Sequence, residues 1–412
     1  MFGLELPILK VNTKTMPDFF RNKLGRYLLF YFLLLIIYTV FSYSLTSPNL
    51  VLTSWTPYWR FQTWMWSNFF NNRQLLTYSY LALMIPLFVT YFKIIKSWPK
   101  KQNISWWLPL LIASPLVLSN NALSYDVFNY IFNAKMVVVY QANPHLQTAL
   151  DFAADNWTRF MHNTHTSAPY FYGWTGLSLL PYFLGGGKFL PTWIIFRLFS
   201  FLSLGLLSFS LVTNSKNKQG IWLPLLLFNP LLLIEVVSNV HNDLWMMVPA
   251  LVAMVLITQK RTGKNILVSL TLLLLSASIK LATVALLPLW LALVLPWEKA
   301  WPKLHNFVTN NWAFLASLVM FLPLLTPRSK QFLPWYLVWS LIWLPLINKK
   351  WRAWKASLVI LAISSMLRYA PHLWFGNYEG EVIHQQQLIT WVPLILFWII
   401  KLFRCKLAGK NS

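Results

Sequence analysis

The stretch YLLFYFLLLIIYTVFSYSL, from Tyr27 to Leu45, contains no charged side chain and is close to the roughly 20 residues that a helix needs to cross a bilayer. Apolar runs of this kind recur along the chain of 412 residues, in which 57% of residues are hydrophobic and 11% are charged. Soluble domains average about 25% charged residues, and the mean hydropathy here is +0.52. The sequence therefore predicts an all-α integral membrane protein.

About 12 apolar runs are candidates for transmembrane helices, once runs slightly below the usual span are included. Besides the first, they are 75–95, 104–118, 190–212, 221–237, 244–258, 266–278, 281–295, 312–325, 333–347, 357–366 and 388–402. The chain shows no internal repeat and no linker-like tract, so a single polytopic membrane domain over 1–412 is the simplest organisation. Within it we distinguish N-terminal helices at 1–120, an outer loop at 121–189 and a remaining helix bundle at 190–412.

Lysine and arginine cluster in short loops between these runs, and such loops stay on the cytoplasmic side of a membrane. The clusters are Lys10 to Arg26, Lys93 to Lys101, Lys216 with Lys218, Lys260 to Lys264, Lys299 with Lys303, Lys349 to Arg352, and Lys401 to Lys410. They predict a multi-pass protein of the plasma membrane with a cytoplasmic N-terminus and with the loop 121–189 on the extracytoplasmic face. This assignment requires the short run from Trp174 to Leu184 to lie on, or dip into, the outer face without crossing.

The formal net charge of +24 is the sum of these basic loops. Contact with anionic membrane lipids accounts for it, at about 1 kcal/mol per basic residue near the surface, and we expect no nucleic-acid partner. Cys405 is the single cysteine of the chain. A disulfide framework and a cysteine-based metal site are therefore excluded.

A polar and aromatic segment interrupts the apolar pattern in the outer loop, Ser124-Tyr-Asp-Val-Phe-Asn-Tyr130, continuing to Asn143-Pro-His145. Most of the ten acidic residues map to the outer half of the protein: Asp126, Asp151, Asp155, Glu235, Asp243, Glu379 and Glu381. The basic residues that reach the same half are Lys135, Lys188, Arg197, Lys280, Arg328, Lys330 and Arg368. Ionisable residues at membrane depth are costly and tend to be functional. This clustering predicts an outward-facing site, with Asp126 as its first candidate.

A series of motifs follows in order between Asn121 and Trp343. They are Ser124-Tyr-Asp126, Tyr130, Asn143-Pro144, Tyr172-Gly-Trp174, Phe228-Asn-Pro230, Glu235, His241-Asn-Asp243 and Pro334-Trp-Tyr336. In this order they resemble the GT-C superfamily of polytopic glycosyltransferases, and within it the bacterial mannosyltransferases that use a polyprenol-phosphate-mannose donor. The chain departs from the family pattern at Asn133 and Ala142, where many relatives have Gly, at His145 for Tyr and at Trp174 for Pro. These departures leave open which sugar is transferred.

The resemblance implies a GT-C fold with juxtamembrane helices in an extracytoplasmic loop, and a hexosyltransferase of the cell envelope. The implied reaction moves a hexose, mannose by resemblance, from a polyprenyl-phosphate donor to a hydroxyl of a glycan, glycolipid or protein acceptor. It also implies that Asp126 is the general base, a role typically worth about 10² to 10⁴ in rate. Asp126 opens an apolar, aromatic pattern and is also suited to capping a helix, so both roles remain open.

Departure of the donor phosphate requires fixed positive charge where negative charge develops. We predict Arg197 and Lys280 as phosphate contacts, with Lys135 and Lys188 behind them. Arg197 is alternatively an interface anchor. Lys280 interrupts the apolar stretch 266–295 and is alternatively placed at a helix hairpin, with its ammonium group at the membrane surface.

The candidate substrate contacts combine polar and aromatic side chains. They are Tyr125, Tyr130, Asn143, Glu235, His241, Asn242, Asp243, Trp335 and Tyr336. A helix cap is the competing explanation for Asn242 and Asp243, and a belt at the membrane interface is the competing explanation for the aromatic residues. Trp335 and Tyr336 follow Arg328 and Lys330, where a prenyl chain and its phosphate would reach the site.

We expect no cofactor, although one set of side chains in the outer loop offers ligands for a divalent metal. These are His145, His162 and His165 with Asp151 and Asp155. The rival functional class is a transporter or flippase of lipid-linked or small polar substrates. We find no pair of Gly- or Pro-broken helices at matching positions of two halves, a pattern common in transporters. The presence of Asp126 argues against a non-catalytic lipid-binding protein of the same fold, so an enzyme is favoured.

Overall fold

The computed structural model describes residues 22–47, 50–99, 103–214, 220–325 and 332–408. These ranges contain helices and no strand, and helix makes up 76% of the structure. Several basic residues named in the sequence analysis, for the topology or for the outer half, lie outside the described residues, as does the side chain of Cys405. They are Lys10, Lys14, Arg21, Lys100, Lys101, Lys216, Lys218, Arg328, Lys330 and Lys410. The all-helical prediction is confirmed.

The longest helices are α2 (Lys23–Ser42), α4 (Arg73–Ser97), α8 (Phe189–Asn214), α11 (Asp243–Gln259), α12 (Gly263–Ile279), α14 (Pro302–Phe321), α16 (Arg352–Leu367) and α18 (Glu381–Ala408). Shorter α-helices are α3 (Thr56–Met65), α5 (Leu108–Ala113), α6 (Asp126–Val139), α7 (Tyr172–Leu184), α9 (Trp222–Leu227), α10 (Pro230–Leu233), α13 (Leu287–Val294), α15 (Val338–Leu341) and α17 (Tyr369–Phe375). Single 3₁₀ or π turns extend or join them: η1 (Tyr43–Leu45), η2 (Trp66–Phe70), η3 (Ser114–Leu118), η4 (Ala149–Phe152), η5 (Thr158–Phe160), η6 (Ile234–Ser238), η7 (Leu281–Leu286), η8 (Leu322–Leu325), η10 (Pro334–Leu337) and η11 (Lys349–Trp351).

Within the described residues, six helical segments are long and apolar enough to cross a membrane, as expected for an integral membrane protein. A seventh span results if Pro230–Ser238 and Asp243–Gln259, which meet at a bend of 119°, are counted as one. Every predicted run overlaps a helical segment, although 104–107 and 342–347 lie outside any helix, and the count of about 12 spans is not confirmed. Several runs are divided into short pieces, since a proline ring removes a hydrogen bond and clashes with the preceding helical turn.

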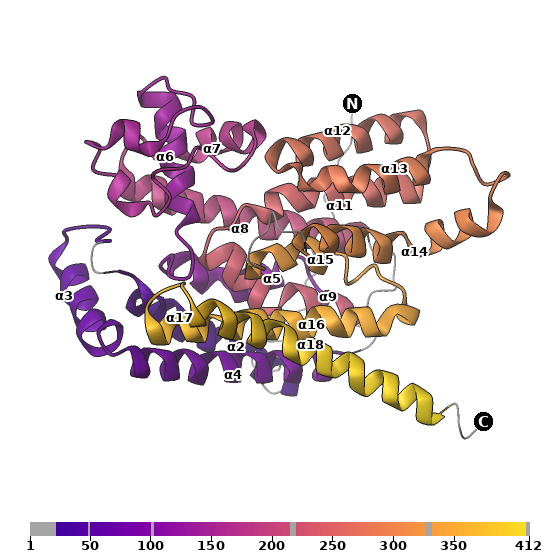
Figure 1. The fold of residues 1–412 in the computed structure, drawn as a ribbon, viewed down its shortest axis with the longest axis horizontal. Coiled ribbons are helices and arrows are strands. Elements are labelled where there is room, and N and C mark those ends of the chain that lie inside the picture. Colours follow the sequence, from indigo (N-terminus) through magenta and orange to yellow (C-terminus); the bar gives the residue numbers. More distant parts are fainter. Residues whose placement is uncertain (1–21, 48–49, 100–102, 215–219, 326–331, 409–412) are drawn as a thin grey trace.

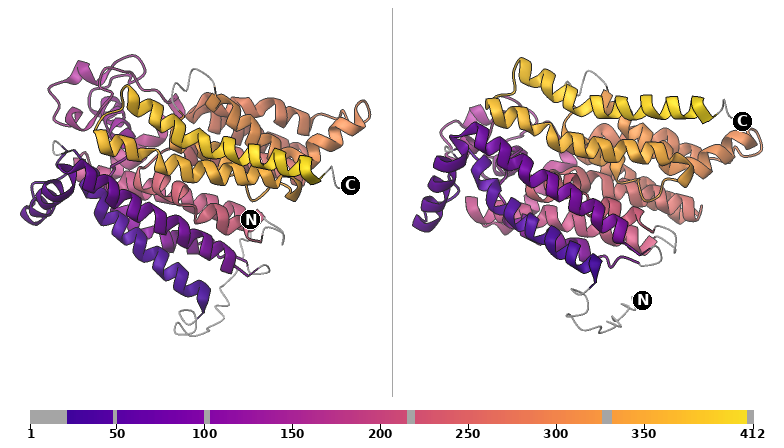
Figure 2. Two further views of the ribbon diagram at one scale, coloured as in Figure 1. Left: turned by 60° about the horizontal axis from the view of Figure 1, so that its bottom comes forward. Right: turned by 90° about the horizontal axis from the view of Figure 1, so that it is seen from below.

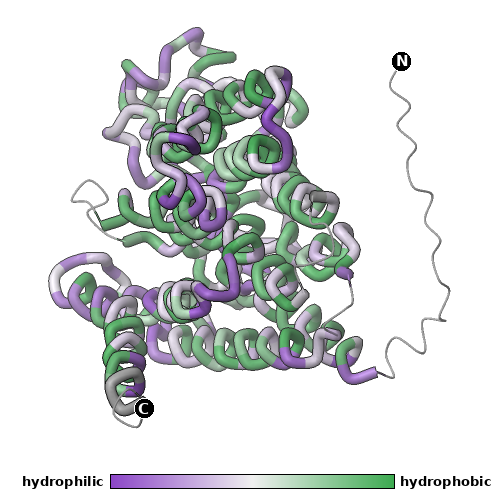
Figure 3. Tube along the Cα trace, turned by 90° about the vertical axis from the view of Figure 1, so that its right-hand side faces the viewer, coloured by the Kyte–Doolittle hydropathy of each residue, from purple (hydrophilic) through white to green (hydrophobic). Residues whose placement is uncertain are grey.

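Most of the long helices run roughly parallel, and α3, α6, α7 and α17 gather at one end of the bundle (Figure 1). Figure 3 looks along the helices and shows mainly hydrophobic segments through the bundle, with hydrophilic segments in the loops. Helix α7, which includes the run from Trp174 to Leu184, is not among the six segments long enough to span. It packs against α6, α8 and α12. The side of the membrane on which this end lies stays a prediction.

The broken helix α9–α10–η6 passes through the centre of the bundle and carries Glu235 into the site. Its break at Asn229 and Pro230 frees backbone carbonyls, which must be satisfied inside a membrane protein. Tyr31 of α2 donates a hydrogen bond to the Phe228 carbonyl at 2.8 Å, and Tyr91 of α4 donates to the Leu225 carbonyl. The N-terminal helices α2 and α4, which lie side by side in both views of Figure 2, thus hold the helix that positions Glu235.

Candidate active site

Helix α6 places Asp126 at its first position, directly after the N-cap residue Tyr125, whose side chain does not cap the helix. The backbone N–H of Asp126 donates a hydrogen bond to the Ser124 hydroxyl at 3.3 Å. The carboxylate instead accepts a hydrogen bond from the hydroxyl of Tyr170, 2.6 Å from Oδ2. Its side chain keeps 18% of its surface exposed. The alternative that Asp126 is a helix cap is therefore wrong. Tyr170 was not among the predicted site residues, and it lies 44 positions from Asp126 in the sequence.

His241 lies between two carboxylates. Its Nδ1 is 3.5 Å from Oδ2 of Asp126, and its Nε2 is 3.4 Å from Oε2 of Glu235. The ring stacks on Trp335 with 4.0 Å between centroids. The chain turns sharply between η6 and α11, where Val240 adopts a φ of 61°, an unusual conformation for a β-branched residue. This turn brings His241 towards α6.

The charges in this cluster act on one another. Asp126 and His241 lie outside the helical segments that are candidates to span the membrane, whereas Glu235 lies in η6. Burial raises the pKa of Asp126, but the nearby His241 ring, whose Nδ1 lies 3.5 Å from Oδ2, with contributions from Tyr170 and Lys280, outweighs burial and leaves that pKa below its ordinary value. Burial lowers the pKa of His241, but Asp126 and Glu235 outweigh it and raise that pKa to about 9. At neutral pH, Asp126 is therefore an ionised carboxylate able to accept a proton.

Glu235 is fully buried behind His241. Its Oε1 accepts a hydrogen bond from the hydroxyl of Tyr369 at 2.8 Å, and its Oε2 accepts one from the Asn239 amide at 2.8 Å. The structure places Glu235 beside the site and not on the cavity wall. Its carboxylate contacts protein groups, so it is suited to orienting His241.

Lys280 and Asp243 form a buried ion pair on the other side of the same turn. Lys280 Nζ lies 2.8 Å from Asp243 Oδ1, and the indole of Trp339 donates to the same oxygen. Lys280 is 8% exposed and lies over the ring of Tyr170, 4.7 Å from its centroid. The surface position considered for Lys280 is therefore wrong. The helix-cap alternative for Asn242 and Asp243 is also wrong, because α11 has no side-chain cap.

Arg197 is 1% exposed and holds the end of η3. Its donors reach the backbone carbonyls of Val117 and Leu116 at 2.7 and 2.8 Å, and the side chains of Asn121 and Ser119 at 2.7 Å. It does not line the cavity described below. The surface anchor considered for it is wrong, since the side chain is buried, and its predicted phosphate contact stays untested.

The other predicted cations lie in the outer loop, away from the cavity. Lys135 pairs with Asp155 and covers the ring of Trp157, and Lys188 is exposed in the turn before α8. Asn143 accepts a hydrogen bond from the backbone of His145 at 3.0 Å. None of these residues lines the cavity.

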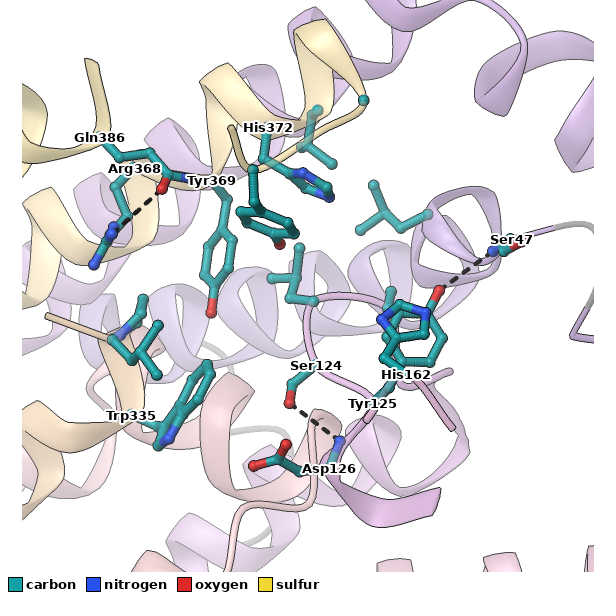
Figure 4. A pocket seen from close by; sticks show the side chains of 18 of the residues that line it. Ser47, Ser124, Tyr125, Asp126, His162, Trp335, Arg368, Tyr369, His372 and Gln386 are labelled. Atoms are coloured by element: carbon teal, nitrogen blue, oxygen red, sulfur yellow. Dashed lines mark hydrogen bonds between the residues drawn. The ribbon is translucent and has the colours of Figure 1, made fainter. Parts of the chain in front are cut away.

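A cavity of about 670 Å³ opens beside Asp126 at this end of the bundle. Figure 4 shows Asp126, Trp335, Tyr369 and Arg368 around the same space. The polar and aromatic side chains on its wall are those of Ser47, Phe70, Arg73, Ser124, Tyr125, Asp126, Asn129, His162, Asn163, Trp335, Arg368, Tyr369, His372, Tyr378 and Gln386. The predicted residues on this wall are thus Tyr125, Asp126 and Trp335.

The remaining predicted contacts lie behind the wall. Tyr130 is buried and donates a hydrogen bond to the Tyr170 hydroxyl at 3.4 Å, and Tyr336 packs on Trp339. His241 is covered by Trp335. Asn242 is buried, and its side-chain amide has no hydrogen-bond partner.

Two arginines on the cavity wall were not predicted as site residues. Arg368 is 3% exposed, donates one hydrogen bond to Gln386 at 3.4 Å, and has no partner for its second terminal nitrogen. Arg73 opens α4 and lies over the ring of Phe70. It also approaches Gly376, where φ is +76° and a Cβ would lie 3.3 Å from the guanidinium carbon. Both arginines lie next to a long apolar run, and this position could have marked them in the sequence as candidate site cations.

The outer-loop residues considered for a metal are engaged separately. His145 lies 2.9 Å from the Thr175 hydroxyl, His162 stacks on Tyr125, and Asp151 accepts from the Thr148 backbone at 2.8 Å. Among the residues that the structure describes, no group of three or more His, Cys, Asp or Glu side chains is placed to hold a metal ion. The expectation that no cofactor is required stays a prediction.

One comparison with known proteins gives a match. Residues 39–296 match a family model whose description is alpha-(1->6)-mannopyranosyltransferase, N-terminal domain. The matched segment runs from α2 to just beyond α13 and includes Asp126, His241 and Lys280, whereas Arg368 lies beyond it. No curated protein and no solved structure gives a match.

Proposed function

We propose, from the premise that the chain belongs to the alpha-(1->6)-mannopyranosyltransferase family of GT-C mannosyltransferases, that it moves mannose from a polyprenyl-phosphate donor to an acceptor hydroxyl. Membership makes the protein a membrane enzyme of sugar transfer. The donor, the base and the acceptor are the proposed parts. One observation carries them: the Asp126 carboxylate lines a cavity of about 670 Å³ that is also lined by Arg73 and Arg368.

Asp126 serves as the general base in this proposal. The acceptor hydroxyl attacks the anomeric carbon of mannose, its proton passes to Asp126, and the bond from that carbon to the phosphate oxygen breaks. Tyr170 and His241 hold the carboxylate through contacts of 2.6 and 3.5 Å. A positioned base is worth typically about 10² to 10⁴ in rate.

Arg368 and Arg73 are the proposed cations for the departing phosphate. A guanidinium group offers a planar set of donors that matches phosphate geometry, and fixed positive charge stabilises the charge that develops. Lys280, predicted from sequence for this role, is already paired with Asp243. We assign Lys280 to the support of Tyr170, whose ring it covers.

The acceptor and the face of the membrane complete the proposal. The family description names an alpha-(1->6) linkage, which points to the primary 6-hydroxyl of a hexose in a glycan, glycolipid or glycoprotein. The basic clusters predict that the site end of the bundle faces away from the cytoplasm. A reporter fused after Lys350 that proved to lie outside would overturn this orientation.

The test is mannosyl transfer by purified protein from a panel of polyprenyl-phosphate sugars. Asp126→Asn should lower turnover by about 10² or more while donor binding persists. Asp151→Asn is the matched control, because Asp151 is an exposed acid of the same loop that does not line the cavity. Full activity of Asp126→Asn would place the base elsewhere. Transfer from a nucleotide sugar alone would exclude the proposed donor.

A further inference from the structure

A second hollow, of about 600 Å³, lies between α16 and α18. Its lining side chains are apolar except for one serine: Ile360, Ile363, Ser364, Leu367, Leu388, Ile389, Val392 and Pro393. The two helices lie side by side in both views of Figure 2. Only 11% of the apolar window of α18 is buried, so this helix lies at the periphery of the bundle. We call this hollow the α16–α18 groove.

The linings of the α16–α18 groove and of the active-site cavity adjoin on both helices. Leu367 lines the groove, and the next residue, Arg368, lines the cavity. On α18, Gln386 lines the cavity and Leu388, two residues further, lines the groove. Figure 4 shows Arg368 and Gln386 joined by a hydrogen bond at this junction. The apolar groove therefore ends, on both helices, within two residues of the buried cation Arg368 and its partner Gln386.

Arg368 has spare hydrogen-bonding capacity at the junction. Its side chain is 3% exposed, yet one terminal nitrogen has no partner. A buried donor without a partner carries a desolvation cost, which is larger for a charged group. A phosphate oxygen would satisfy this donor and match the charge of the guanidinium group.

We infer that the α16–α18 groove holds the isoprenoid chain of the donor, with its phosphate at Arg368. This inference rests on the proposed function, which supplies a lipid with one chain and one phosphate. From Ile360 to Leu367 the groove follows α16 for about 10 Å at 1.5 Å per residue, so it receives the isoprene units nearest the phosphate. Burial of those units in an apolar wall provides affinity without contacting the sugar.

The first test fills the groove. Ile389→Trp should raise KM for a long-chain polyprenyl-phosphate mannose by about tenfold, with little change for an analogue that has a single isoprene unit. Leu396→Trp is the control, because Leu396 lies on the same helix, is 51% exposed and does not line the groove. Arg368→Gln should raise KM for both donors. An unchanged KM of Ile389→Trp for the long-chain donor would overturn the inference while the proposed transfer stands.

The second test does not depend on transfer. A sugar-free polyprenyl phosphate with a photoreactive group in its first isoprene units should label α16 and α18, and Ile389→Trp should abolish the label. If the label maps there but no sugar is transferred, the proposed function fails and the lipid site stands. Labelling elsewhere would overturn the inference. Phosphatidylglycerol, a lipid with two chains, is the competitor that tests specificity. If vesicles of it displaced the photoreactive probe as well as unlabelled polyprenyl phosphate does, the inference would also be overturned, because the groove would then be a general lipid site.

Discussion

Two acid–base clusters lie on either side of the turn between η6 and α11, and they differ in how completely their charges are paired. In the first, His241 is shared between Asp126 and Glu235 at 3.5 and 3.4 Å, and the Asp126 side chain remains 18% exposed. In the second, Lys280 contacts Asp243 at 2.8 Å, and the Asp243 side chain has no exposed surface. We call them the open cluster and the closed cluster.

The difference separates a reactive arrangement from a supporting one. A buried ion pair with close partners contributes little net stability, yet breaking it is costly because one charge is left unpaired. A carboxylate that faces a cavity keeps oxygen atoms available for a substrate. The open cluster therefore fits the proposed role of a general base, and the closed cluster fits a supporting role for the wall that carries Tyr170. Residue type alone does not distinguish them, since both combine acids with a basic side chain.

The largest expected effect concerns the closed cluster. Lys280→Met leaves Asp243 buried without its cation, and we expect a loss of about 3–5 kcal/mol in the free energy of unfolding, measured by thermal unfolding in detergent. Adding Asp243→Asn to the Lys280→Met protein should restore most of the lost stability, because it removes the uncompensated charge. A Lys280→Met protein as stable as the wild type but inactive would instead support the phosphate contact predicted from the sequence.

The next effect concerns His241 in the open cluster. His241→Gln removes the positive charge that helps to hold the pKa of Asp126 below its ordinary value. That pKa should rise, so the base becomes protonated at a higher pH. The acid limb of the pH profile of kcat/KM should move upward by about one unit. An unchanged acid limb would show that His241 does not act on Asp126.

The smallest effect concerns the support behind His241. Tyr369→Phe removes the hydrogen bond of 2.8 Å to Glu235, and we expect a loss of about 1 kcal/mol, seen as a several-fold lower kcat/KM. Tyr80→Phe is the matched control, because it removes a buried tyrosine hydrogen bond of 2.8 Å to the Met366 carbonyl. Equal losses of activity in the two variants would mean that Glu235 has no particular part in the site.

The predicted membrane helices follow from local pattern and are recovered in the structure as helical segments. The number of spans is less secure, because prolines and turns divide some apolar runs into pieces. The run 221–237, for example, becomes α9, α10 and η6 around Asn229 and Pro230. Whether such pieces together cross a membrane depends on how neighbouring helices satisfy the freed backbone groups.

The candidate site was found in part. Asp126 and His241 were both candidate residues, but their contact was not predicted, and their other partners lie far along the chain: Tyr170 is 44 positions from Asp126, and Tyr369 is 134 from Glu235. Arg368 carried the same sequence signal as other outer cations. Only its burial, its free donor and its position on the cavity wall distinguish it from Lys135, which pairs with Asp155.

The sequence by itself determined the membrane class, the positions of the helices and the scarcity of acids that made Asp126 stand out. These properties depend on composition and on patterns within one helix length, where apolar side chains must face lipid or other helices. The tertiary structure alone decided which charges are paired and which face the cavity. Pairing requires atoms from distant segments within a few ångströms, so the same lysine or arginine becomes a structural partner or a candidate phosphate contact only once the helices are packed.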